Sequence, residues 1–144
     1  MRIIYIGSDH AGFELKQMLV TELGRLGFEA RDMGTSSTES CDYANIAHPL
    51  CEEVLKSKER GILICGTGLG MSMAANRHKG IRAAKCNTEL EAALARRHND
   101  ANVLCLGARI TGSELAAAIV LAFLEGKFEG GRHERRIGQI ETGA

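Results

Sequence analysis

The stretch that most constrains the fold of this chain spans residues 61–76, where a short apolar run passes into a glycine turn and then into a helical pattern. Ile62, Leu63 and Ile64 are apolar at successive positions. Both faces of the strand that they predict must therefore be covered, as in a parallel sheet with helices on either side. The strand ends at Cys65, and three glycines then remove side chains from the turn, so that backbone N–H groups can approach a ligand at the start of the next helix: Gly66, Gly68 and Gly70.

This turn places Cys65 where a thiol can do chemistry. A helix N-terminus lowers the pKa of a cysteine from its free value of about 8.5, and the same amides can stabilise an oxyanion that develops on a substrate. The alternative is that Cys65 is only a small core residue at the end of a strand, because free cysteine is among the most buried residue types. The three glycines favour the reactive interpretation.

Length and composition exclude several classes of protein. The chain has 144 residues, 18 basic and 18 acidic side chains and no Trp, which argues against nucleic acid as a partner. The longest apolar stretch, residues 115–124, is half the length of a membrane span, and the N-terminus runs directly into a strand pattern rather than a signal peptide. The five cysteines are odd in number and lack metal-ligand spacing, so we expect reduced thiols, no metal site and a cytoplasmic protein without a membrane partner.

Strand and helix patterns alternate along the whole chain. Apolar runs predict strands at 2–7, 28–33, 61–65, 80–84 and 103–106, and helical spacing predicts the helices that separate them. This order predicts a single α/β domain over residues 1–144, with a five-stranded parallel sheet between two layers of helices and a C-terminal helical tail from about residue 130. Capping boxes predict helix starts at Thr88 with Glu91 and at Thr111 with Glu114, and Pro49 is expected in the first turn of its helix or at a kink.

Polar residues collect where the predicted strands meet the helices. Asp9 and His10 follow the first strand, at the sheet edge where parallel α/β proteins bind ligands. Asp9 can equally be a helix cap. Arg132 and Arg136 are four residues apart and can clamp a phosphate from one helix face, although charge runs of this kind are usually solvated.

Three better-known loop motifs nearly match and fail. Met71 occupies the position where a dinucleotide fingerprint needs its third glycine. A cysteine phosphatase loop needs an arginine at the same position. The run from Gly7 to Gly12 has the spacing of a phosphate-binding P-loop but lacks its lysine. A thiol, a glycine turn and scattered histidines and arginines remain.

Seven segments together closely resemble the type B ribose-5-phosphate isomerases, a family that also holds the allose-6-phosphate and galactose-6-phosphate isomerases. The resemblance keeps order and spacing over nearly the whole chain, and its segments are 8–12, 42–43, 61–72, 97–100, 102–104, 107–109 and 130–133. It implies a Rossmann-like fold, a homodimer or dimer of dimers with active sites between subunits, and the cofactor-free interconversion of an aldose and a ketose phosphate in the pentose phosphate pathway.

The resemblance also implies a role for each site residue. Cys65 matches the base that moves a proton between C1 and C2 through an enediolate, and His98 of the neighbouring chain, with Thr67, matches the group that opens the sugar ring. Backbone N–H groups would hold the enediolate, the sugar would contact three polar side chains, and four cationic residues would hold the phosphate. The backbone N–H groups are those of Gly66, Gly68, Gly70, Met71 and Ser72. The polar side chains are Asp9, Tyr43 and Asn99, and the cationic residues are His10, Arg109, Arg132 and Arg136.

One position departs from the family pattern. Members usually carry proline directly after the Asp-Tyr pair, whereas here Ala44 follows Tyr43 and the proline is Pro49. The expected substrate is ribose 5-phosphate, with a six-carbon sugar phosphate as the alternative. A protein that binds sugar phosphates without catalysis is a further alternative, which the presence of both Cys65 and His98 disfavours.

Overall fold

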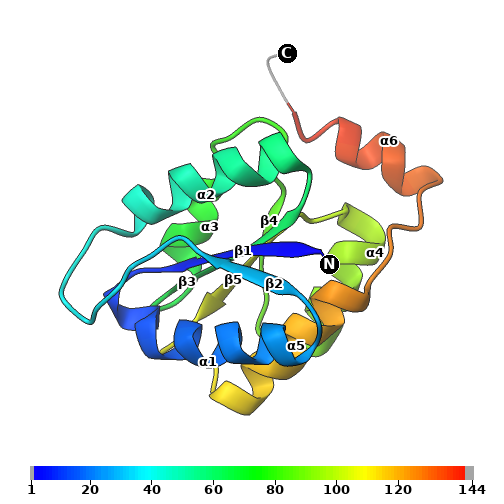
Figure 1. The fold of residues 1–144 in the computed structure, drawn as a ribbon. Coiled ribbons are helices and arrows are strands. Elements are labelled where there is room, and N and C mark those ends of the chain that lie inside the picture. The colour runs from blue at the N-terminus through cyan, green and yellow to red at the C-terminus, as the bar shows by residue number, and fades with distance from the viewer. Residues whose placement is uncertain (1, 142–144) are drawn as a thin grey trace.

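A five-stranded, fully parallel sheet forms the centre of the molecule. The computed structural model describes residues 2–141. The strand order is β2-β1-β3-β5-β4, with β3 in the middle (Figure 1). The strands are β1 (Ile3–Ser8), β2 (Glu29–Asp32), β3 (Arg60–Cys65), β4 (Ala83–Lys85) and β5 (Val103–Gly107). The predicted three-layer fold with a five-stranded parallel sheet is confirmed.

Helices cover both faces of the sheet. One apolar core lies between the sheet and α1, α4 and α5, and the other lies between the sheet and α2 and α3 (Figure 1). The short helix α6 follows these elements near the C-terminus. The helical elements are η1 (His10–Gly12), α1 (Phe13–Arg25), α2 (Tyr43–Ser57), α3 (Leu69–Ala75), α4 (Glu89–Asn99), α5 (Ser113–Glu125) and α6 (Arg132–Gly138).

The central strand is buried on both faces, as its unbroken apolar run predicted. Ile62 and Ile64 belong to the core under α1, α4 and α5, whereas Leu63 and Cys65 belong to the core under α2 and α3. Successive side chains of a strand point to opposite faces, which explains this division. The Cys65 side chain therefore lies on the side of α2 and α3.

The two predicted capping boxes have different outcomes. Thr88 is the N-cap of α4, and its side chain accepts a hydrogen bond from the Glu91 N–H at 3.1 Å, as predicted. The prediction at Thr111 is wrong, because α5 begins at Ser113 and its N-cap is Gly112. Thr111 is buried and its N–H donates to the Gly107 carbonyl, so it belongs to the turn that follows β5.

Helix α2 begins one turn earlier than the apolar spacing indicated. It starts at Tyr43, so Pro49 lies inside the helix beyond the first turn, and the prediction that places it in the first turn is wrong. Ile46 in the added turn packs against the second core, which favours the longer helix. Tyr43 is thereby held at the N-terminus of a helix rather than in a loop.

A partly buried ion pair ties α1 to the end of β2, and a further hydrogen bond ties it to the turn that follows. The side chain of Lys16 is 1% exposed, and its Nζ lies 2.6 Å and 2.7 Å from the two carboxylate oxygens of Asp32. The same ammonium donates to the Thr35 carbonyl at 2.7 Å. All three donors of the lysine are therefore satisfied.

None of the helices between residues 2 and 141 has the length and hydrophobicity that crossing a bilayer requires.

Candidate active site

The candidate site is built around the turn that follows β3. Gly68 has a φ of 81° and is the N-cap of α3, a conformation that glycine adopts without strain. Its N–H donates to the Cys65 sulfur at 3.1 Å. The residue Cys65 is 5% exposed, so the sulfur lies at the inner end of the turn, beside the first turn of α3.

The end of β5 braces this turn from the neighbouring strand. The N–H of Ala108 donates to the Cys65 carbonyl, and the N–H of Arg109 donates to the Gly66 carbonyl, both at 2.9 Å. These bonds bring the Arg109 side chain over the turn: a Cβ on Gly66 would lie 3.0 Å from a guanidinium nitrogen. Glycine at position 66 therefore makes room for a cation beside the thiol.

A cavity of about 650 Å³ opens over the thiol. Its walls come from the ends of β1 and β3, the start of α2 and the turn after β5, all at the carboxyl edge of the sheet. The lining residues are Asp9, Cys41, Asp42, Tyr43, Ala44, Asn45, Cys65, Gly66, Thr67, Gly70 and Arg109. The volume of this cavity lies within the range of about 300–1,000 Å³ that is typical of small-ligand sites. A sugar phosphate of five or six carbons is a ligand of suitable size.

Asp9 both caps a helix and faces the cavity. Its Oδ1 accepts hydrogen bonds from the N–H groups of Ala11 and Gly12 at 3.0 Å and 3.2 Å. Asp9 therefore caps a helix, as the alternative prediction has it. Asp9 nevertheless lines the cavity while 8% exposed. The capping bonds fix the carboxylate in place for a ligand.

Tyr43 closes the cavity from the side of α2. Its ring packs directly on Gly70, where a Cβ would lie 2.2 Å from Cε1. The glycine at position 70 is thus required by the close approach of an aromatic ring.

The Thr67 hydroxyl accepts a hydrogen bond from the Leu69 N–H at 3.2 Å.

Three more of the expected residues lie near the thiol without lining the cavity. His10 accepts the N–H of Cys41 on its Nδ1 at 3.2 Å and so supports the cavity wall. Met71 lies in the first turn of α3 with its side chain fully buried, so only its backbone can serve a ligand. Ser72 lines a separate hollow, and its N–H donates within the helix to the Gly68 carbonyl.

The remaining four expected residues lie elsewhere on this chain. His98 and Asn99 end α4, and Arg132 and Arg136 lie on α6. Helix α4 ends shortly before β5 begins, so its C-terminus lies at the amino edge of the sheet, opposite the edge that carries Cys65 (Figure 1). A strand of five or six residues separates the two edges by roughly 17–20 Å. The thiol and these four residues therefore cannot meet within one chain.

Some residues of the cavity were not predicted from the sequence. Cys41 and Asn45 line it, but neither stands in a recognisable pattern, because a loop and the start of α2 bring them there. The other cysteines, Cys51, Cys86 and Cys105, are buried in the two cores. Burial raises the pKa of the Cys51 thiol to about 12 and that of Cys105 well above its usual range.

A second cavity, of about 500 Å³, lies at the amino edge of the sheet. Its walls carry both basic and acidic side chains, among them Arg60, Arg82 and Asp100. The residues that line it include no thiol and no histidine. This cavity therefore lacks the thiol that the cavity at the carboxyl edge contains.

A parallel α/β sheet with a thiol in a glycine turn, and a carboxylate and a guanidinium facing the same cavity, defines a small-molecule enzyme of the α/β class. The family model described as Ribose/Galactose Isomerase matches residues 4–140. The chain belongs to this family.

Named relatives agree over almost the full length. The chain is 47% identical over 141 residues to ribose-5-phosphate isomerase B of Escherichia coli, which covers 97% of this chain and 95% of the relative. The structure of a ribose 5-phosphate isomerase from Thermotoga maritima is 52% identical with a TM-score of 0.94, covering 96% of this chain and 97% of the other. The enzyme from Mycoplasma genitalium, solved with bound ribulose 5-phosphate, is 44% identical with a TM-score of 0.92 and covers 96% and 93%.

Proposed function

We propose that this protein interconverts ribose 5-phosphate and ribulose 5-phosphate without a metal or organic cofactor. The observation that carries the proposal is the thiol of Cys65, held by the Gly68 N–H at the base of a cavity that Asp9 and Arg109 also line. Relatives at 44% to 52% identity that are named for this reaction support it, and one of them was solved with the ketose product bound. The same proposal places the enzyme in the cytoplasm and in the pentose phosphate pathway.

In this proposal the thiolate of Cys65 removes the proton from C2 of the open-chain aldose. The electron pair of the C–H bond forms the C1–C2 double bond, and the carbonyl oxygen on C1 becomes the enediolate oxyanion. The proton of the C2 hydroxyl passes to the oxyanion on C1, and the electrons left on that oxygen form the carbonyl at C2. The electrons of the C1–C2 double bond then take the proton back from the same sulfur onto C1. A base poised near neutral pH and a preformed site for the oxyanion are what this proton transfer needs.

Backbone and side-chain groups around the turn would share the binding of the substrate. The first N–H groups of a helix have no partner within the helix, so those of Gly70 and Met71, with the turn at Gly66 and Gly68, are proposed to hold the enediolate. The Gly68 N–H donates to the Cys65 sulfur and the Ser72 N–H is used within α3, so these two are the weakest of the expected donors. Asp9 and Tyr43 are proposed to contact sugar hydroxyls, and Arg109 with His10 to attract the phosphate.

The active site is proposed to be completed by a second copy of the chain, in a homodimer or dimer of dimers. His98, Asn99, Arg132 and Arg136 lie at the opposite edge of the sheet from Cys65, so one chain cannot use both groups on one sugar. In the proposed assembly the partner supplies His98, which with Thr67 opens the furanose ring, Asn99 for a sugar hydroxyl, and the two arginines for the phosphate. Remote phosphate binding then orients the sugar over the thiol.

Cys65→Ala tests the chemistry. We expect this variant to lose turnover of ribose 5-phosphate while still binding it, and chelators to leave the wild-type rate unchanged. Cys51→Ala is the matched control, because it removes a thiol that packs in the core rather than in the cavity. Full activity of Cys65→Ala would overturn the proposed base.

Hybrids of two inactive chains test the shared site. In an equal mixture of Cys65→Ala and His98→Ala chains that exchange freely, half of the dimers are hybrids and each hybrid holds one intact site, so recovery reaches about one quarter of the wild-type rate. Mass spectrometry of the mixture verifies that hybrids form. Hybrids without activity would contradict the shared site while leaving the role of Cys65 standing.

A six-carbon sugar phosphate is a second candidate substrate. Ala44 lines the cavity next to Tyr43, where the smaller and less rigid residue changes the wall. Turnover of ribose 5-phosphate, allose 6-phosphate and galactose 6-phosphate should be compared directly. Binding of all three without conversion would instead support a non-catalytic binding protein.

A further inference from the structure

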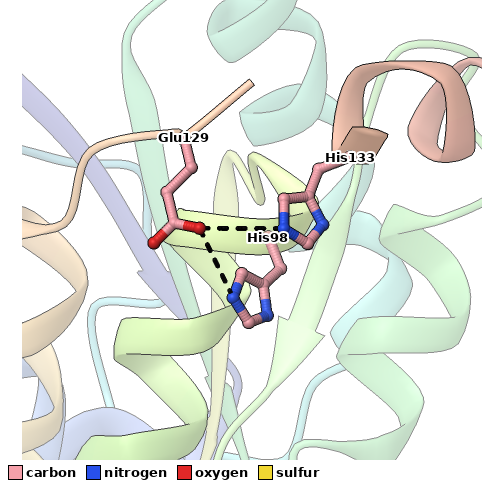
Figure 2. Close-up of side chains that lie close together, drawn as sticks. All are labelled: His98, Glu129 and His133. Carbon is pink, nitrogen blue, oxygen red and sulfur yellow. Dashed lines mark ion pairs between the residues drawn. The ribbon is translucent and has the colours of Figure 1, made fainter. Parts of the chain in front are cut away.

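Three metal-ligating side chains meet outside the Cys65 cavity. His98 comes from the end of α4, His133 from the first turn of α6 and Glu129 from the segment before α6 (Figure 2). We call these three residues the His–Glu–His cluster. Nε2 of each histidine lies 3.7 Å from Oε1 of Glu129, and one ligand atom from each residue lies within 4.8 Å of the others.

His133 has a nitrogen without a partner. Its side chain is 9% exposed, and its Nε2 has no hydrogen-bond partner among residues 2–141. The distance of 3.7 Å to Glu129 is too long for a hydrogen bond. A buried polar atom of this kind calls for an explanation, and Figure 2 shows that it points toward the Glu129 carboxylate.

The Glu129 carboxylate is held so that one of its oxygens faces the two histidines. Arg97 donates to Oε2 of Glu129 at 2.9 Å. This bond orients the carboxylate and leaves Oε1 toward the histidines, as an outer-shell partner does in metal sites.

We propose that the His–Glu–His cluster binds a divalent transition metal, with zinc as the best match. Two imidazole nitrogens and one carboxylate oxygen, with water in the fourth position, form a common tetrahedral zinc site. At metal–ligand distances of about 2.0–2.2 Å the ligand atoms lie roughly 3.3–3.6 Å apart. The two His–Glu separations of 3.7 Å need little contraction.

The two rings must also separate for their lone pairs to converge. They are stacked at 4.3 Å with an interplanar angle of 11°. His98 is the ring that can move, because its side chain is 35% exposed whereas that of His133 is 9% exposed. Metal binding would therefore rotate His98 out of the stack.

This rotation gives the site a regulatory consequence, which rests on the proposed function. A His98 nitrogen that is bound to zinc cannot exchange a proton with the sugar ring, so zinc is a reversible inhibitor of ring opening and not a cofactor. The catalytic thiol of the same chain lies at the other edge of the sheet and is not a ligand of this metal.

Binding is tested with zinc chloride and tag-free protein by isothermal titration calorimetry. The Cys65→Ala background removes the thiol that would compete for zinc. We expect one zinc per chain at the cluster, movement of the His98 and His133 ring signals in NMR spectra, and at least tenfold weaker binding, about 1.4 kcal/mol, in both His133→Gln and Glu129→Gln. Two matched controls, His78→Gln and Glu134→Gln, should bind as the parent does.

Inhibition is measured separately, as the ratio of isomerase rates with and without zinc for each variant. Wild-type protein should be inhibited and recover with EDTA, and His133→Gln should need at least tenfold more zinc. Unchanged binding in both His133→Gln and Glu129→Gln would overturn the site, and equal inhibition of wild type and His133→Gln would overturn its regulatory role. An inactive metal-free wild type would refute the proposed function while leaving the calorimetric test valid.

Discussion

Gly107→Ala should disturb the thiol turn from a neighbouring strand, through the backbone of Thr67 and without substituting any residue that lines the cavity. Gly107 ends β5, and its φ is not in the left-handed region, so alanine is compatible with its backbone. A Cβ at this position would lie 2.6 Å from both the carbonyl carbon and the oxygen of Thr67. Any effect therefore arises from this close approach and not from backbone strain.

The size of the effect follows from the contact. The Thr67 peptide must retreat by about 0.8 Å, from 2.6 Å to the ordinary contact distance of 3.4 Å. The obstacle is backbone, which cannot rotate away as a side chain can. Overpacking of this kind costs about 1–3 kcal/mol of the free energy of unfolding, and a misplacement near 1 Å at a catalytic group costs on the order of 10²-fold in rate.

The assay combines the kinetics of ribose 5-phosphate isomerisation with thermal unfolding of the same sample. We expect kcat/KM to fall about 10²-fold while the circular dichroism spectrum stays native and Tm falls by a few degrees. Gly24→Ala is the control, because nothing lies within 4 Å of its Cβ and the change should slightly stabilise α1. A folded Gly107→Ala protein with wild-type kcat/KM would refute the link between the Thr67 peptide and catalysis.

Further substitutions test the packing around the site and in the core. Gly70→Ala places a methyl group 2.2 Å from the Tyr43 ring. Because Tyr43 is 39% exposed, its ring can swing outward, so KM should rise severalfold with little change in Tm. An unchanged KM would argue against a role for Tyr43 in binding. Asp32→Asn leaves the buried Lys16 ammonium without its carboxylate. Because the Asp32 side chain is 40% exposed and water can reach this pair, the cost in urea unfolding should be about 1–3 kcal/mol. Lys16→Met removes the buried charge itself and should cost less, and the reverse order would contradict this reasoning. Burial raises the pKa of Cys51 to about 12. Its thiolate fraction at pH 8 is therefore on the order of 10³-fold below that of a free cysteine with a pKa of about 8.5. Mass spectrometry should find Cys51 unalkylated by iodoacetamide unless the protein is unfolded.

The thiol turn could be predicted from the sequence because its causes are local. An apolar run fixes β3, and glycines at 66, 68 and 70 permit the turn. The structure adds the partner that each glycine accommodates: Arg109 at Gly66 and Tyr43 at Gly70. These contacts come from distant elements, so spacing alone could not identify them.

Helix starts and long-range clusters were harder to predict. Thr111 and Glu114 have the spacing of a capping box, but the turn after β5 uses Thr111 and moves the start of α5 to Ser113. Glu129 and His133 form no motif with His98, because more than one element separates them in the chain. Only the docking of α6 against α4 shows that the three side chains meet.

The placement of Cys65 and His98 at opposite edges of one sheet has a consequence for how activity depends on the amount of protein. If two copies must meet to complete each site, a newly synthesised chain is fully folded and yet inert toward a closed sugar ring. Specific activity then falls on dilution below the dissociation constant of the assembly, long before any chain unfolds. The enzyme would become active when two folded chains associate, and not when a single chain folds.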